Sequence, residues 1–390
     1  MNRPVLIVAL IGLAAVGLLA LDERGWRLGA AALIGGAAGI GLYHASFGFT
    51  AAWRRMVREQ RSAGLRAQML LIGLACLFTF PLMAWGGEIG INARGFILPM
   101  GVTSAFGAFV FGIGMQLGGG CASGTLFTTG GGSSRMLITL VFFIAGSVWA
   151  TAHWDFWTSL PRTSSGTSIP RELGTVPGLL LMLAVLAGIA LLCAWLERRK
   201  HGALEVPKPT QSILRGPWSL VAGALVLAAV SIATMMVLGR PWGVTSAFAL
   251  WGAKVAAGAG LPVETWAYWT PGWRQAQLDN SVFANGTSVM NFGIVFGAMA
   301  AASLANKFSP NLNLSARDVA TAVIGGLLMG YGARLAYGCN IGAYLGGLVS
   351  GSLHGWWWLI WGFIGSLVGT WARERIGMDP PLLFRRAKPA

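Results

Sequence analysis

The sequence predicts an all-α polytopic membrane protein with an inverted internal repeat, and three observations lead to this fold class. Of its 390 residues, 55% are apolar and only 11% are charged, whereas charged residues make up about a quarter of a soluble domain. Glycine is abundant, with 57 residues, which is typical of closely packed or interrupted membrane helices. A glycine-rich motif around a cysteine also occurs twice, so we expect two related halves embedded in a lipid bilayer.

Apolar stretches long enough to cross a bilayer recur along the whole chain. The first, residues 4–21, is preceded only by Arg3 and followed by no clear small-residue cleavage pattern. We interpret it as an uncleaved helix, with a signal peptide as the alternative. Nine more stretches follow, which predicts about nine or ten transmembrane helices. They cover residues 27–44, 67–85, 96–117, 136–153, 175–196, 218–238, 286–304, 319–338 and 356–371.

Basic residues are concentrated in three segments outside these helices, at residues 54–66, 198–215 and 373–388. Cytoplasmic loops of membrane proteins carry an excess of Lys and Arg, so all three segments are expected in the cytoplasm, together with both chain termini. Because the basic residues fall in these loops, the net charge of +15 needs no nucleic-acid partner, and we expect none.

The glycine–cysteine motif appears first around Cys121 and again around Cys339, 218 residues later. Counting spans between the basic segments makes the first copy begin from the cytoplasmic side and the second from the opposite side. The two halves are therefore expected to be inverted relative to each other. Glycines in the surrounding turns match across the same interval: Gly112 with Gly330, Gly114 with Gly332, Gly120 with Gly338, and Gly124 with Gly342.

A second pair of motifs begins at Gly48 and Gly243. The hexapeptide that begins at Gly101 is identical to the one at Gly243, which leaves a competing register open, but pairing Gly48 with Gly243 keeps the motif order within each half. The segments 121–134 and 339–352 are too short to cross a core of about 30 Å. We therefore expect four short re-entrant helices or loops, inserted from both sides.

This repeat predicts five parts of the chain. Residues 1–26 form an N-terminal transmembrane helix, and residues 27–174 form the first transmembrane repeat. A connecting helix and basic cytoplasmic loop at 175–217 lead to the second, inverted repeat at 218–372, and residues 373–390 form a basic cytoplasmic tail.

The motif chemistry favours a small anion that contains sulphur. Glycines let backbone N–H groups approach a ligand closely, and the start of a helix carries partial positive charge. A thiol adds a weak donor and a soft, polarizable contact for sulphur. Polar capping of helix ends is the alternative role for Asn340, Ser123 and Thr125, and Arg334 could instead extend to the membrane interface. The expected substrate path comprises Cys121, Cys339, Gly119, Gly120, Gly338, Asn340, Ser123, Thr125, Gly48, Gly243 and Arg334.

No cofactor, metal site or catalytic residue is expected from the sequence. The four cysteines are widely spaced without a C-x-x-C motif, and the chain contains no P-loop and no H-E-x-x-H motif. We expect Cys76 and Cys193, which lie in ordinary apolar spans, to be packing residues. The chain is thus expected to be a transporter rather than an enzyme.

The motifs at residues 118–125, 332–343 and 350–356 closely resemble those of the YeeE/YedE sulphur-transport family, and the likeness covers roughly residues 30–372. The resemblance implies an hourglass-shaped permease of the bacterial inner membrane that takes up thiosulfate in the YeeE branch, whereas YedE members are associated with selenium or other sulphur compounds. It implies that Cys121 and Cys339 pass the terminal sulphur onward through S–H···S hydrogen bonds. It also implies a small cytosolic TusA-like sulphur carrier as partner.

A third path cysteine of that family corresponds to Gly48 here, a departure that moves the chain toward the YedE branch. Our leading hypothesis is a permease that imports thiosulfate or a related small sulphur-containing anion past two facing cysteines. The alternatives are a selenium-compound transporter of the YedE branch, a membrane thiol/disulfide redox subunit that forms a transient Cys121–Cys339 disulfide, and a passive channel for small anions.

Overall fold

The computed structural model describes residues 1–380, and its regular secondary structure is helical apart from two isolated bridges. Within these residues, nine helical stretches are long and apolar enough to cross a membrane. The predicted fold class, an all-α polytopic membrane protein, is confirmed.

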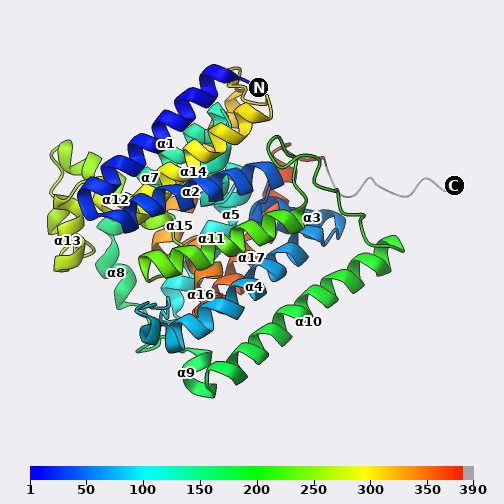
Figure 1. Cartoon of the computed structure of the whole chain (residues 1–390), viewed down its shortest axis with the longest axis horizontal. Coiled ribbons are helices and arrows are strands. Elements are labelled where there is room, and N and C mark those ends of the chain that lie inside the picture. The colour runs from blue at the N-terminus through cyan, green and yellow to red at the C-terminus, as the bar shows by residue number, and fades with distance from the viewer. Residues whose placement is uncertain (381–390) are drawn as a thin grey trace.

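Ten long helices match the ten apolar stretches of the sequence (Figure 1). The helix nearest the C-terminus, Leu353–Arg375, is the one missing from the nine helical stretches counted above, because its many tryptophans lower its mean hydropathy. The long helices are α1 (Arg3–Arg24), α2 (Trp26–Ala45), α4 (Ala63–Trp85), α5 (Val102–Gly118), α7 (Ser134–Ala152), α10 (Thr175–His201), α11 (Leu220–Leu238), α14 (Gly286–Leu304), α15 (Ala316–Leu335) and α17 (Leu353–Arg375).

One predicted helix start is wrong. The sequence predicts a helix over residues 96–117, yet α5 begins only at Val102. Gly101 is fully extended, with φ −176° and ψ −179°, and pairs with Arg162 in an isolated bridge. The apolar residues before it therefore run along the loops at this end of the molecule, where their backbone bonds to other loops.

Four short helical segments follow long helices at the predicted motifs. They are α3 (Phe49–Glu59), α6 (Ala122–Gly130), α12 (Thr245–Gly258), and the π-helical η4 (Asn340–Leu345), which continues into α16 (Gly346–Leu348). At about 1.5 Å per residue none of them is long enough to cross a bilayer. Gly48 and Gly243 both precede such a short segment, whereas Gly101 precedes a long helix, which favours the Gly48–Gly243 pairing.

The remaining helices of residues 1–380 are short and lie in loops. They are η1 (Gly86–Ile89), α8 (Trp154–Ser159), α9 (Ile169–Leu173), η2 (Val263–Thr265), α13 (Gly272–Asp279) and η3 (Val282–Ala284).

Helices α5 and α15 pack against each other in a self-complementary way. A Cβ atom added at Gly114 would lie 2.7 Å from the backbone nitrogen of Met329, and one added at Gly332 would lie 2.7 Å from that of Phe111. Each residue and its counterpart, 111 with 329 and 114 with 332, are 218 positions apart. Two equivalent surfaces in mutual contact are characteristic of a twofold axis.

The two helices are antiparallel, because the N-terminal part of α5 lies against the C-terminal part of α15: a Cβ at Gly107 would lie 2.7 Å from the carbonyl oxygen of Gly332. The twofold axis is therefore perpendicular to both helices. It inverts one half of the chain relative to the other, as the repeat predicts.

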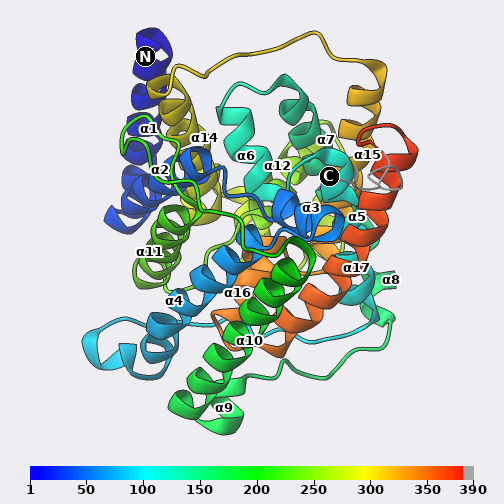
Figure 2. The same ribbon diagram turned by 90° about the vertical axis from the view of Figure 1, so that its right-hand side faces the viewer.

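The same relation extends to the next helices, since α17 packs on α5 as α7 packs on α15. A side chain at Gly112 would collide with the carbonyl oxygen of Gly362, and one at Gly330 would collide with that of Phe143. Figure 2 separates this group from a second one, in which α2 packs on α14 and is flanked by α1 and α11. Helix α10 lies at the edge against α4 (Figure 1).

The three basic segments of the sequence meet on one face of the molecule. Arg55 pairs with Glu205 at 3.1 Å, and Arg58 pairs with Asp379 at 3.2 Å. Hydrogen bonds from Arg373 hold the pKa of the Asp379 carboxyl below its usual value. We call this surface the basic face. The rest of the predicted basic tail, with Arg385, Arg386 and Lys388, lies outside the described residues.

Candidate functional site

The first glycine–cysteine turn joins α5 to α6. Gly119 ends α5 with φ +91°, a backbone conformation that favours glycine. Arg135 closes the end of α5, because its Nη1 donates to the carbonyl oxygen of Gly118 at 2.9 Å and its Nη2 to that of Leu117 at 2.8 Å. Cys121 then caps α6 in an extended conformation, with φ −81° and ψ −172°.

The second turn, between α15 and η4, repeats this backbone geometry. Cys339 has φ −97° and ψ −168° and precedes η4. Its carbonyl oxygen accepts the N–H of Ala343 at 2.8 Å, as that of Cys121 accepts the N–H of Thr125 at 2.7 Å. The glycine before each cysteine is needed for space: a Cβ at Gly338 would lie 2.8 Å from the nitrogen of Ala343. A Cβ at the equivalent Gly120 would lie 3.3 Å from the nitrogen of Thr125, which is also tight.

Both thiols are buried in the same core, with Cys121 1% and Cys339 0% exposed. The segments that they cap, α6 and η4, contact each other. The structure thus brings together two turns that are far apart in the sequence. All four cysteines are free thiols, and Cys76 and Cys193 lie in the long helices α4 and α10.

The polar neighbours of the two cysteines differ in their partners. Ser123 lies with its Oγ 3.4 Å from the Cys121 Sγ, and the Thr125 hydroxyl donates to the carbonyl oxygen of Cys121 at 2.9 Å. Asn340 is fully buried, yet neither its Oδ1 nor its Nδ2 has a hydrogen-bond partner. A buried amide without partners is costly, so Asn340 retains polar capacity for a ligand or water.

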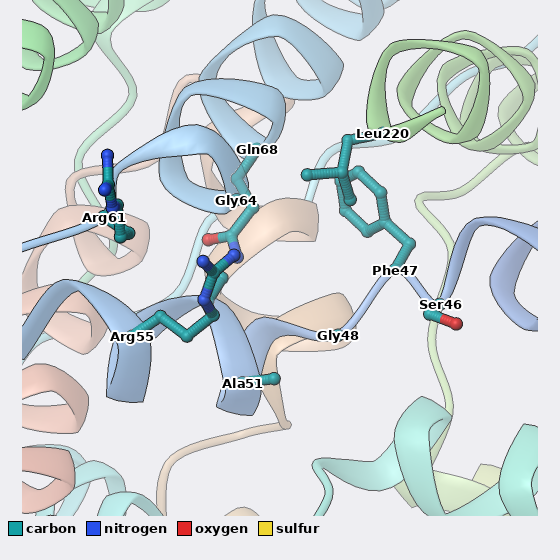
Figure 3. Close-up of a pocket in the computed structure, with 10 residues that line it drawn as sticks. Ser46, Phe47, Gly48, Ala51, Arg55, Arg61, Gly64, Gln68 and Leu220 are labelled. Carbon is teal, nitrogen blue, oxygen red and sulfur yellow. The ribbon is translucent and has the colours of Figure 1, made fainter. Parts of the chain in front are cut away.

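The two remaining glycines of the expected path are in different places. A Cβ at Gly342 would lie 3.8 Å from the Cα of Gly243, so the Gly243 loop covers the Cys339 turn. Gly48 instead lines a pocket on the basic face (Figure 3).

Arg334, in the last turn of α15, is only 7% exposed, and no carboxylate of residues 1–380 forms an ion pair with it. Its Nε and Nη1 have no hydrogen-bond partner. Its Cζ lies 5.1 Å from the centre of the Tyr268 ring, and the Cζ of Arg274 lies 4.0 Å from the same centre. The sum of these distances limits the separation of the two guanidinium carbons to at most about 9.1 Å.

Sequence reasoning missed Arg274, in the short helix α13, and Tyr268, in the turn before it, which both lie more than fifty residues before Arg334. It also missed the aromatic group around η4. The Tyr344 ring stacks on Trp358 at 6.1 Å, and its hydroxyl is buried without a partner. Trp358 donates its Nε1–H to the carbonyl oxygen of Gly338 at 3.2 Å and so fixes the Cys339 turn. No local pattern distinguishes these aromatic side chains from ordinary packing residues.

No three His, Cys, Asp or Glu side chains in residues 1–380 are grouped as metal ligands would be. The described site consists of thiols, backbone amides, an asparagine and two arginines, which suit a small anion.

Comparison with known proteins gives matches along most of the chain. The thiosulfate transporter TsuA of Spirochaeta thermophila is 27% identical over 366 residues, which cover 91% of this chain and 98% of that protein. TsuA of Escherichia coli is 23% identical over 354 residues, or 87% and 92% of the two chains. The probable transporter YedE of Escherichia coli is 32% identical over 168 residues, a match that covers 43% of this chain but only 39% of YedE.

A family model described as sulphur transport matches residues 44–368. This range runs from the end of α2 into α17, so it includes both cysteine turns and all four short helical segments. The chain is a multi-pass membrane protein, and it belongs to the sulphur transport family.

Proposed function

We propose that this protein is a permease that imports thiosulfate, or a related small sulphur-containing anion, along a central path with Cys339 and Cys121 as successive contacts. The observation that carries the proposal is the pair of equivalent glycine–cysteine turns at opposite ends of the antiparallel helices α5 and α15. Transporters with inverted repeats commonly bind their substrate where interrupted helices meet. Relatives named thiosulfate transporters support the choice of substrate.

At each turn, a substrate anion would meet a thiol and the first backbone N–H groups of a helix. These amides have no partner within the helix, and the helix dipole favours negative charge at this end. A thiol can donate a hydrogen bond to the terminal sulphur of thiosulfate. Asn340 adds an unpartnered amide next to Cys339. An anion is thus stabilised by neutral donors that do not hold it as tightly as a salt bridge would.

Arg334 and Arg274 form the outer mouth of the proposed path. A buried guanidinium without a carboxylate partner is unstable unless an anion compensates its charge. Arg334 is such a group, and the half-buried Arg274 shares its Tyr268 ring, so the two cations attract a divalent anion to the end of α15, one turn before Cys339. Long-range attraction by unpaired charges also increases the rate at which an anion arrives.

We also propose an orientation in the membrane, the bounds of the two repeats and a cytosolic partner. The basic face is cytoplasmic, as the positive-inside rule favours, so both termini lie inside and the outer mouth faces the periplasm of a bacterial inner membrane. Residues 27–174 and 218–372 are the two transmembrane repeats, and four short segments re-enter from both sides. A cytosolic TusA-like sulphur carrier receives the imported sulphur at the basic face.

Uptake of labelled thiosulfate into a sulphur-auxotrophic host tests the proposal. Cys121→Ala and Cys339→Ala should each abolish uptake while the protein remains folded and inserted. Cys193→Ala is the matched control, since Cys193 lies in the edge helix α10, and it should transport normally. Full uptake by the Cys121→Ala/Cys339→Ala double variant would contradict the two-cysteine path.

A second candidate substrate is a selenium compound or another sulphur species. It is favoured by Gly48, which lacks a thiol at the position where the resemblance places a third path cysteine. A competition assay decides between the substrates: uptake of labelled thiosulfate is measured with an excess of selenite or of unlabelled thiosulfate. Stronger inhibition by unlabelled thiosulfate would favour thiosulfate as the substrate, and stronger inhibition by selenite would favour selenium.

A further inference from the structure

A pocket of about 90 Å³ opens on the basic face beside Gly48 (Figure 3). It is formed where α2 leads into α3, and α4 and α11 provide its other walls. Phe47 and Leu220 give it an apolar side, whereas Arg55, Arg61 and Gln68 give it a polar one. Gly48 also lines the pocket, and because it has no side chain it leaves this part of the pocket unfilled.

Gln68 has an unpartnered donor in this pocket. The side chain is 1% exposed, and its Oε1 accepts the Nε1–H of Trp53 at 3.0 Å. This bond fixes the orientation of the amide, because an indole N–H can only donate. The Gln68 Nε2 then has no partner among residues 1–380. A buried donor without an acceptor destabilises the fold unless a ligand or water accepts from it.

The charged residues of the pocket are cations. Arg55 uses its Nε for Glu59 and its Nη2 for Glu205, and its Nη1 has no such carboxylate. Arg61 uses its Nη1 for Glu197. The three carboxylates lie outside the pocket lining, so the pocket presents amide and guanidinium donors. Such a donor set binds a small oxyanion.

Aromatic contacts connect this pocket to the Cys339 turn. Trp53, which holds Gln68, packs edge-on against Tyr344 at 6.1 Å, and Phe49 contacts the same ring at 6.1 Å. Tyr344 lies on η4, five residues after Cys339. The pocket therefore lies between the buried end of η4 and the basic face.

We propose that this pocket is a distinct anion-binding site at the inner end of the path, where Gln68 Nε2 and Arg55 hold the oxygen atoms of the substrate before its release. The proposal rests on the proposed function, which supplies thiosulfate as the anion. It assigns Gln68 a role as a binding residue, and it gives Gly48 the role of keeping the pocket open.

Hydrogen exchange of the full-length protein in detergent, with mass spectrometry, locates the site. Sodium thiosulfate and sodium sulfate are the probes, and sodium chloride at equal ionic strength is the reference. Thiosulfate should slow exchange in residues 46–53 and 63–68. Sulfate should do the same at similar concentrations, because the donors contact oxygen atoms. Absence of this protection in the wild-type protein would overturn the site.

Gln68→Glu is the sharpest variant, since it keeps an oxygen acceptor for Trp53 and replaces the free donor with negative charge. It should raise the thiosulfate concentration for half-protection at least about tenfold, in line with losing a charge-assisted hydrogen bond. Gln211→Glu makes the same charge change at an exposed position on the basic face and should change little. Equal protection in Gln68→Glu and wild type would contradict the proposal.

Ala51→Trp provides a second route if Gln68→Glu does not fold. Ala51 is exposed and lines the pocket, so a large side chain there fills the space without disturbing the core, and protection should disappear. The Cys121→Ala/Cys339→Ala variant should lose uptake but keep protection. If that variant transports normally, the proposed function fails; if Gln68→Glu and Ala51→Trp both keep protection, only the inner site fails.

Discussion

The two cysteine turns share their backbone but differ in the side chains around them. After Cys121 the chain forms a regular helix, in which Ser123 and Thr125 are satisfied by local contacts. After Cys339 it forms a π-helix, in which Asn340 and Tyr344 are buried without partners. A π-helix often occurs at functional sites. The duplicated backbone is therefore a shared scaffold, and the buried polar groups without partners are concentrated at the second turn.

The arginines near the two turns differ in the same way. Arg135 donates to two backbone carbonyls and so completes the end of α5. Arg334, at the end of α15, has no carboxylate partner in residues 1–380 and lies on an aromatic ring instead. Arg135 thus closes the end of a helix, whereas the Nε and Nη1 of Arg334 have no hydrogen-bond partner in residues 1–380.

The largest loss of stability is expected at the contact between α5 and α15, where equivalent substitutions test whether the two helices are related by a twofold axis. Gly114→Ala and Gly332→Ala each put a Cβ 2.7 Å from a backbone nitrogen of the opposite helix, so each should cost about 1–3 kcal/mol of stability. Thermal unfolding in detergent measures both. Gly188→Ala in α10, where a Cβ meets no atom within 4 Å, is the control and should not destabilise. A loss confined to one member of the pair would contradict the twofold relation.

Substitutions of Arg334 and Arg135 are expected to have different effects, one on uptake and the other on stability. Arg334→Gln should lower thiosulfate uptake about tenfold at limiting substrate without lowering the unfolding temperature, because it removes a buried cation that has no carboxylate partner. Arg135→Gln should instead cost about 1–3 kcal/mol of stability, since the carbonyls at the end of α5 lose their donors. Uptake assays and thermal unfolding on the same preparations provide both readouts. The assignment of roles is wrong if Arg334→Gln is the less stable variant.

A smaller difference is expected between the polar neighbours of the cysteines. Asn340→Ala should reduce uptake several-fold and leave stability nearly unchanged, because its amide has no protein partner to lose. Thr125→Ala breaks a hydrogen bond to Cys121 and should cost about 1 kcal/mol, with uptake preserved. Kinetics with labelled thiosulfate distinguish the two. Normal uptake by Asn340→Ala would remove the amide from the path.

The smallest effect on the fold is expected for Gly48→Cys. A Cβ there would lie 3.8 Å from its nearest neighbour, and φ is −114°, so a side chain fits. Stability should change by no more than about 0.5 kcal/mol. The new thiol should react with a membrane-impermeant maleimide in inside-out vesicles, whereas the buried native cysteines should not. A thiol that reacts only in right-side-out preparations would reverse the proposed orientation.

Much of the fold could be predicted from the sequence because its signals are local. Continuous apolar runs mark the long helices, and the glycines around Cys121 and Cys339 mark where helices are interrupted. The start of α5 could not be predicted, since the apolar residues before Gly101 look helical in isolation. Their backbone is held by distant loops, and Thr163 Oγ1 accepts the N–H of Met100 at 3.0 Å.

By itself, the sequence determined the membrane class, the repeated cysteine motif and the candidate path residues, because composition and short motifs depend only on neighbouring residues. The tertiary structure alone placed Arg274 with Arg334 on one ring, and Gln68 beside Gly48 in a pocket. It also decided which polar side chains have partners. Those properties depend on packing between helices that are far apart in the chain, and burial makes an unpartnered donor or cation costly only after the chain has folded.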